Sequence, residues 1–297
     1  MTKRLPVVSQ AERWIHCPAS FKAQIAYPRL DNTPSQAALE GRSCHTMLEE
    51  LRAGGTLVSG AGSLDEEHGV IRTQDMIGAV YECFNVTPDH AVLESRIDLS
   101  IIYPGWYGFC DAYFFEDGVL RVYDYKFGHT YVQVEENVQL IAYALGIIAI
   151  EGLSDDHEVI LHILQPRDYR SGEPRHRKWS TSVGELRNYT KVLHDAITEA
   201  LKPVPPASTG KQCKYCSARA NCKAFKEVQY DCIDYAGSLS LTNITNEQIG
   251  VDLVSITSAI EHLKNAQNAL EEQALHKLKN GEQVRGWSLD TVRGRTK

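Results

Sequence analysis

The residues most suggestive of chemistry are Asp124 and Lys126, which stand two apart at the end of the apolar run 119–123. Alternate residues of a β-strand project from one face, so the carboxylate and the ammonium group should lie side by side. Two charges at the end of a buried strand need compensation, either from each other or from a metal ion and a substrate. An Asp-x-Lys pair is also common as a weak, exposed ion pair, and on these residues alone both interpretations stay open.

A second carboxylate, Asp111, is expected on the neighbouring strand. It lies within the strand pattern 107–116, and Asp117-Gly118 after that pattern is typical of a two-residue hairpin turn. Two carboxylates and a lysine on adjacent strands are the minimum set for metal-dependent hydrolysis of a phosphodiester. A divalent cation neutralises the phosphate and lowers the pKa of the attacking water. We therefore expect Mg²⁺ or Mn²⁺ at this place.

Further polar residues fit the same chemistry. His45 lies on a predicted helix, Glu94 lies in the first strand pattern, and Gln139 and Tyr143 are separated by one helical turn. Each also has an ordinary interpretation, because histidines are commonly structural and the others could belong to a helix surface or a strand face. We expect His45 and Glu94 to belong to the catalytic set with Asp111, Asp124 and Lys126.

The elements that must position these residues alternate between helices and strands. Helices are expected over 9–26 with a break near Cys17-Pro18, and over 34–53, 73–84, 134–150, 183–201 and 246–280. Strands are expected over 91–102, 107–116, 119–127 and 158–165. This order predicts an α/β fold in which helices flank a mixed central β-sheet, with helical additions at the N-terminal and C-terminal ends.

A second metal site is indicated by Cys213, Cys216 and Cys222, which form a C-x₂-C-x₅-C pattern. The surrounding segment has little apolar sequence in which three cysteines could be buried. A closed zinc site or an iron–sulfur cluster needs a fourth ligand. The spacing leaves Cys17 and Cys232 as the main candidates, with Cys44, Cys83 and Cys110 behind them.

Composition narrows the class of protein. The chain has 297 residues and a net charge of −7, which argues against nonspecific coating of nucleic acid but allows a local basic track. No apolar run approaches the ~20 residues of a membrane span, and the N-terminus has no signal-peptide pattern. We expect a cytoplasmic protein whose eight cysteines do not form a disulfide framework.

A basic segment follows the strand pattern 158–165, and aromatic residues are interleaved with it. Basic residues beside aromatic rings suit single-stranded nucleic acid, through phosphate contacts and base stacking, but a solvated loop is an equally good interpretation. The residues expected to contact DNA are Arg167, Arg170, Arg175, Arg177 and Lys178.

The chain resembles the RecB-like branch of the PD-(D/E)XK nuclease superfamily. The resemblance rests on four motifs in order: Gly41–His45, Gly108–Asp111, Asp124–Lys126 and Gln139–Tyr143. It implies a restriction-endonuclease-like core in which His45, Asp111, Asp124 and the main-chain carbonyl of Tyr125 bind the catalytic metal. It also implies that Lys126 acts on the attacking water, as base or as positioner, and that Gln139 and Tyr143 hold the DNA strand.

The same resemblance favours Cys17 as the fourth ligand of a [4Fe–4S] cluster with Cys213, Cys216 and Cys222. Structural Zn²⁺ in the same thiolates is the alternative. The cluster would close a nuclease domain over residues 1–232, with its core at 37–201 and its cysteine segment at 210–232. Residues 233–297 would form a helical tail with a basic C-terminus.

The expected activity is that of a phage or prophage DNA exonuclease acting at DNA ends in recombination, replication or repair within a bacterial host cell. Expected partners are DNA, a helicase or single-strand annealing protein, and a second copy of the chain. One alternative is a non-catalytic scaffold that binds DNA or a protein. Another is a nuclease subunit that depends on a separate helicase, because the chain has no Walker A motif of its own.

Overall fold

The computed structural model describes residues 4–29, 35–60, 64–170, 172 and 174–290. The chain divides into two compact units, and each is built from two separate segments. Unit 1 comprises residues 1–12 and 33–198, and unit 2 comprises residues 13–32 and 199–297. The candidate catalytic residues all belong to unit 1, whereas Cys17, Cys213, Cys216 and Cys222 belong to unit 2.

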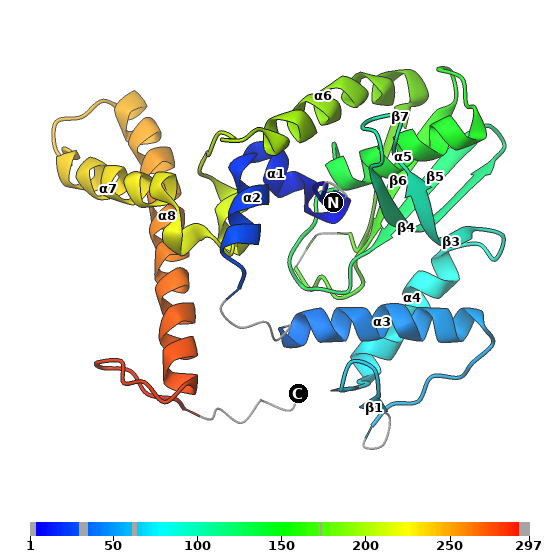
Figure 1. Cartoon of the computed structure of the whole chain (residues 1–297), viewed down its shortest axis with the longest axis horizontal. Helices are drawn as coiled ribbons and strands as arrows, with labels where there is room; N and C mark the ends of the chain where they lie inside the picture. The colour runs from blue at the N-terminus through cyan, green and yellow to red at the C-terminus, as the bar shows by residue number, and fades with distance from the viewer. Residues whose placement is uncertain (1–3, 30–34, 61–63, 171, 173, 291–297) are drawn as a thin grey trace. The chain divides into compact units, whose positions relative to one another are not determined.

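Unit 1 is organised around a mixed five-stranded sheet in the order β3-β4-β5-β6-β7 (Figure 1). Only β5 and β6 run parallel, and the other neighbouring strands are antiparallel. Asp117 and Gly118, between β4 and β5, have φ angles of 51° and 76°, which is the backbone of the expected tight hairpin. The strands are β3 (Val92–Asp98), β4 (Tyr107–Glu116), β5 (Val119–Tyr125), β6 (Glu158–Leu164) and β7 (His176–Ser182).

Helices cover both faces of this sheet. Helix α5 (Val138–Glu151) packs against β3 to β6 and is apolar nearly all round, as expected for a buried helix. Its Gly146 permits a close approach to β3, because a β-carbon there would lie 2.4 Å from Ile97 Cγ2. Helices α3 (Gln36–Arg52) and α4 (Gln74–Val86) share an apolar cluster with residues of β4 and β5 such as Phe114 and Tyr125.

Shorter elements complete unit 1. The 3₁₀ helix η1 (Val8–Gln10) contacts β4 and α5, and the carbonyl of Pro6 accepts a hydrogen bond from Trp106 Nε1 at 2.7 Å. A small hairpin, β1 (Leu64–Asp65) and β2 (Val70–Ile71), lies beside α3. Helix α6 (Val183–Leu201) follows β7 directly.

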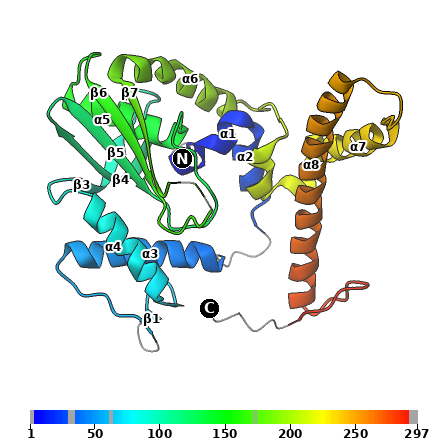
Figure 2. The ribbon, with the colours of Figure 1, turned by 180° about the vertical axis from the view of Figure 1, so that it is seen from behind.

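Unit 2 is helical. Helix α1 (Ala11–His16) enters it, and α2 (Ala19–Ala26) follows the break at Cys17-Pro18. Two short 3₁₀ helices, η2 (Lys211–Tyr215) and η3 (Arg219–Asn221), carry or adjoin the other cysteines. Helix α7 (Lys223–Ser238) packs against the long α8 (Asn246–Lys279), and Figures 1 and 2 show this pair from opposite sides.

The predicted fold class is confirmed: a mixed α/β sheet is flanked by helices, with further helices at both ends. The elements that were not predicted are β7, α7, the two strands of the hairpin β1–β2 and the short 3₁₀ helices η2 and η3. Helix α8 is one continuous helix. Among the described residues, none of the helices combines the length and apolarity needed to cross a membrane. The basic tail at 293–297 lies outside the described residues, and the predicted domain boundary at 232 stays a prediction.

Candidate metal centre

Three side chains from three different elements converge at one place in unit 1. They are His45 on α3, Glu94 on β3 and Asp111 on β4. One potential ligand atom of each lies within 4.8 Å of the other two, and this is the one such group of three among the described residues. His45 Nδ1 lies 3.5 Å from Glu94 Oε1. The sequence placed His45 and Asp111 at the metal but gave Glu94 only a catalytic role, whereas the structure puts its carboxylate among the potential ligands.

The sheet register explains why Glu94 and Asp111 meet. Leu93 pairs with Ala112 and Ser95 pairs with Cys110, so Glu94 falls opposite Asp111 on the neighbouring strand. Like charges placed directly opposite each other on a sheet are destabilising. Glu94 also has a φ of 42°, in the left-handed region that glutamate seldom adopts. Both costs are of the kind found at functional sites.

Asp111 is held by the backbone of the next strand. Its Oδ2 accepts a hydrogen bond from the N–H of Tyr125 at 2.6 Å. Burial raises the pKa of Asp111 to about 7, and the charge of Asp124 raises it as well, while His45, Lys126 and the Tyr125 N–H act in the opposite direction. Both causes disfavour the charged form of Asp111, and a bound cation would favour it.

Asp124 and Lys126 lie side by side, as the strand alternation predicts. Lys126 Nζ donates to Asp124 Oδ1 at 2.9 Å, and Gln139 Nε2 donates to the same oxygen at 2.8 Å. Gln139 also lies 3.5 Å from the hydroxyl of Tyr143, so α5 contributes a polar edge to the site. Gly108 makes room for this edge, because a β-carbon there would lie 2.6 Å from Tyr143 Cε1.

The ring of Tyr125 lies beside that of His45, with the two ring centroids 6.4 Å apart. Its hydroxyl shares a hydrogen bond of 2.7 Å with Thr87 Oγ1 next to α4. The predicted role of the Tyr125 carbonyl as a ligand stays a prediction.

The basic groups at the site are surrounded by carboxylates. For Lys126, burial lowers the pKa, but the charges of Asp124 and Asp111 raise it more, so the net shift is upward. For His45, burial again lowers the pKa, and the hydrogen bond to Glu94 with the charges of Asp111 and Glu94 turns the net shift upward. Both groups therefore favour their charged forms among these carboxylates.

The donor set fits a hard divalent cation. Two carboxylates and one imidazole nitrogen come together, with the charge of Asp124 close to Asp111, and oxygen-rich sets of this kind suit Mg²⁺ or Mn²⁺. Asp124 Oδ2 is buried and forms an ion pair with Lys126 Nζ at 2.7 Å, although it accepts no hydrogen bond. The lysine ammonium compensates this oxygen, so the case for a metal ion rests on His45, Glu94 and Asp111.

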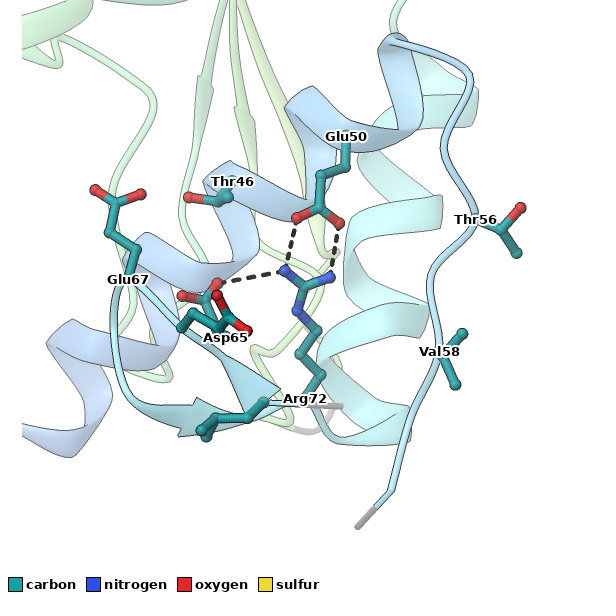
Figure 3. Close-up of a pocket in the computed structure, with 9 residues that line it drawn as sticks. Thr46, Glu50, Thr56, Val58, Asp65, Glu67 and Arg72 are labelled. Atoms are coloured by element: carbon teal, nitrogen blue, oxygen red, sulfur yellow. Dashed lines mark hydrogen bonds and ion pairs between the residues drawn. The ribbon is translucent and has the colours of Figure 1, made fainter. Parts of the chain in front are cut away.

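Helix α3, which carries His45, is fixed by ion pairs on another side (Figure 3). Arg72 forms two bonds of 2.6 Å with Glu50, and it lies 3.6 Å from Asp65. Asp65 is almost fully buried and accepts a hydrogen bond of 2.9 Å from Ser43 Oγ, two residues before His45. These bonds tie the β1–β2 hairpin to α3. The cavity beside them, of about 400 Å³, is lined by none of the metal-centre residues.

In unit 2 the four expected cysteines are neighbours. Burial raises the pKa of Cys213, and the charges of Cys216, Cys17 and Cys222 contribute to the shift; Cys17 and Cys222 raise the pKa of Cys216 in the same way. The N–H of Ala19 bonds to the carbonyl of Pro206 at 2.9 Å, which ties the two segments of unit 2 together beside Cys17.

The other cysteines are elsewhere. Burial raises the pKa of Cys232, and the further contribution comes from Asp231 rather than from a cysteine. Cys44, Cys83 and Cys110 belong to unit 1 and are fully buried. Of the candidates for a fourth ligand, the structure therefore brings Cys17 to the other three.

Comparison with protein families adds one relationship. The family model described as "Protein of unknown function (DUF2800)" matches residues 6–297. The chain belongs to the DUF2800 family. A comparison with curated proteins finds no match. Among solved structures, the DUF2800 chain is similar to one titled "Crystal structure of SSO0001", with 15% identity and a TM-score of 0.37, over 75% of this chain and 89% of that one.

The basic residues expected to bind DNA do not form one exposed track in the DUF2800 chain. Arg167 and Arg177 are both buried. The guanidinium of Arg167 pairs with Glu40 and Asp75, and that of Arg177 pairs with Asp168. Arg170 also pairs with Asp168 at 2.9 Å and Arg175 lies 3.8 Å from Glu82, whereas Lys178 is exposed on β7. DNA binding by these five residues stays a prediction.

Proposed function

We propose that the protein is a metal-dependent deoxyribonuclease that hydrolyses phosphodiester bonds at DNA ends. The observation that carries the proposal is the convergence of His45, Glu94 and Asp111 beside the Asp124–Lys126 pair. These residues come from α3, β3, β4 and β5 and meet at one place. The choice of an exonuclease, and of a phage protein working in the bacterial cytoplasm, follows from the resemblance to RecB-like nucleases.

The residues have separate roles in this proposal. A bound Mg²⁺ or Mn²⁺ would neutralise the scissile phosphate and lower the pKa of a water molecule. His45, Glu94, Asp111 and Asp124 would hold the cation through one nitrogen and three carboxylate groups. Lys126, kept protonated by its acidic neighbours, would orient the attacking water and the phosphate as a charged donor. Gln139 donates a hydrogen bond of 2.8 Å to Asp124 and would help to hold the DNA strand.

The decisive experiment is digestion of end-labelled linear DNA, single-stranded and duplex, beside a closed circle, with Mg²⁺ or Mn²⁺ and with a chelator. We expect metal-dependent release of nucleotides from linear DNA. The variants Asp124→Asn and Lys126→Ala should lose at least ~100-fold in rate, the order expected when a transition-state contact is removed. Glu116→Gln, on the exposed end of β4, is the matched control and should keep full activity.

Each outcome of that experiment decides something. Unchanged digestion by the Asp124 and Lys126 variants would refute the site. Efficient cutting of the circle would refute an exonuclease while leaving the nuclease. DNA binding without hydrolysis under either metal would support a non-catalytic scaffold. Activity that appears only on adding a helicase with ATP would support a nuclease subunit that works with a separate motor.

We also propose that the four neighbouring cysteines hold a [4Fe–4S] cluster with a structural role. Cys213 and Cys216 each lie near Cys17 and Cys222, so four thiolates are available to one metal centre. The preference for iron–sulfur over structural Zn²⁺ follows from the resemblance to RecB-like nucleases. The cysteine thiols must lose their protons on binding, so the bonds to the metal must outweigh the raised pKa values of Cys213 and Cys216.

Anaerobic purification with an absorbance spectrum and metal analysis tests the cluster. We expect a brown protein with about four iron atoms per chain, as the cluster type requires. Cys17→Ser should lose the colour and the iron, and Cys232→Ser should keep both, because Cys232 lies outside the group. Stoichiometric zinc in a colourless protein would replace the cluster with the alternative metal.

A further inference from the structure

Helix α8 carries an apolar seam with coiled-coil spacing. The residues of the seam recur at alternating intervals of four and three, which is the a/d pattern of a heptad repeat. A single polar residue, Gln267, interrupts the seam, as polar residues do at positions that fix the register of paired helices. The apolar members are Ile249, Leu253, Ile256, Ile260, Leu263 and Leu270.

This seam borders the buried face of α8. The residues that α8 buries fully, Ala259, Asn265 and Ala269, lie off the seam, and the seam residues Ile256 and Leu263 are half-buried. Along the seam, by contrast, Leu253 is 60% exposed and Leu270 is 68% exposed, and Ile249 and Ile260 are exposed as well. A row of large aliphatic side chains on one helix face, at the spacing of a helix partner, indicates an interaction surface.

The charges of α8 indicate which partner fits. Its N-terminal half, 246–263, carries Glu247, Asp252 and Glu261 and no lysine or arginine. Its C-terminal half, 264–279, carries three lysines and two glutamates. Of these, Glu272 is bonded to Arg219 at 2.7 Å and Lys277 is bonded to Glu282 at 2.6 Å, so one charge of each sign is paired with a residue outside α8. The two halves of α8 are therefore of opposite charge, so a second α8 running in the opposite direction matches acidic against basic surface.

We propose that α8 binds the α8 of a second copy of this chain as an antiparallel coiled coil. A pairing centred between Glu261 and His262 places Leu253 opposite Leu270 and Ile260 opposite Leu263 of the other copy, with Ile256 opposite the polar Gln267 between these two layers. The helix of 34 residues is about 50 Å long, and the seam takes up three heptads of it. With α7 on its other side, each copy contributes a helix pair to a four-helix arrangement.

Sedimentation equilibrium of the full chain tests the dimer. We expect a dimer at micromolar concentration, and at least a ~100-fold higher dissociation constant for Leu253→Glu combined with Leu270→Glu. Both side chains are more than half exposed in the single chain, so these changes leave its fold intact, which circular dichroism verifies. The matched control is Val254→Glu, one residue off the seam and 73% exposed, which should dimerise like the parent.

Orientation is tested by mixing two single-cysteine variants, Leu253→Cys and Leu270→Cys, under mild oxidation and identifying the joined peptides by mass spectrometry. An antiparallel pair joins position 253 to position 270, whereas 253 joined to 253 would overturn the orientation. A parent that stays monomeric at about 100 μM would overturn the proposal, since a specific dimer is tighter than this. So would a dimer that the seam variants do not weaken. None of these readouts depends on nuclease activity.

Discussion

The exchange Arg167→Met separates a structural role for this arginine from a role in DNA binding. Arg167 Nε donates to Asp75 Oδ2 at 2.8 Å, Nη2 donates to Glu40 Oε2 at 2.7 Å, and Nη1 donates to the carbonyl of Phe127 at 3.2 Å. The guanidinium thus joins α3, α4 and the segment after β5. Methionine keeps much of the apolar stem and removes every donor.

The size of the effect follows from these bonds. A hydrogen bond to a charged group contributes about 1.5–3 kcal/mol, but the groups left behind regain water where they are exposed. The carboxylates of Glu40 and Asp75 are 22% and 47% exposed, so the expected loss is nearer to about 3 kcal/mol than to the sum of the bonds. For a unit of this size, about 2–4 °C per kcal/mol gives a fall in Tm of about 6–12 °C.

Calorimetry and DNA binding at several salt concentrations make the test. Lys178→Met on the exposed side of β7 is the control and should leave Tm within about 1 °C, the usual range for a surface change. If Lys178 contacts a phosphate, its loss lowers the salt slope of binding by about one unit. An Arg167→Met protein with unchanged Tm and a reduced salt slope would refute the structural reasoning and make Arg167 a DNA ligand.

Three further changes have definite expected outcomes. Gly146→Ala would place a β-carbon 2.4 Å from a methyl group of β3 and should cost about 1–3 kcal/mol of unfolding free energy in urea titrations, whereas Gly78→Ala, with open space around it, should be neutral or stabilising. Burial, with the positive charges of neighbouring side chains, lowers the pKa of His162 to about 3. The imidazole of His162 therefore stays neutral in the folded protein, whereas in the unfolded chain it binds a proton below a pKa of ~6.5. Stability is therefore lost as pH falls below ~6.5, by about 2–3 kcal/mol at pH 4.5, and His162→Phe should remove that part of the loss in acid denaturation curves. Ser43→Ala removes a buried hydrogen bond to Asp65 and should cost about 1–3 kcal/mol of unfolding free energy in urea titrations. Arg42→Ala, at the exposed neighbouring residue, is the control, and a smaller loss for Ser43→Ala than for Arg42→Ala would contradict the role given to the hydrogen bond.

Local sequence patterns predicted much of the fold. The alternation of side chains in β5 predicted the contact of Asp124 with Lys126, and Asp117-Gly118 predicted the hairpin before it. Strand β7 was missed because it is a polar edge strand, whose charged and hydroxyl side chains resemble those of a loop. An edge strand pairs with only one other strand and can carry many polar side chains, so its sequence shows little of the apolar pattern by which strands are predicted.

The parts of the site that depend on tertiary structure could not be predicted from the sequence. The meeting of Glu94 with Asp111 depends on the register between β3 and β4, which a single sequence does not reveal. The partners of Arg167 lie on two helices far away in sequence, so its basic character alone suggested nucleic acid. The sequence shows which residues are charged. It does not show which of these charges are neutralised by ion pairs inside the protein.

The segmented construction of the two units sets an order of events during synthesis. The chain enters unit 2 at residue 13, leaves it for unit 1 at 33 and returns at 199. Cys17 therefore emerges from the ribosome some 200 residues before Cys222, a delay of about 10–40 s at ordinary elongation rates. Until Cys213 is synthesised, its thiol has none of its three cysteine neighbours. Only chains translated past Cys222 can complete the quartet, so truncated products are left with the quartet unformed.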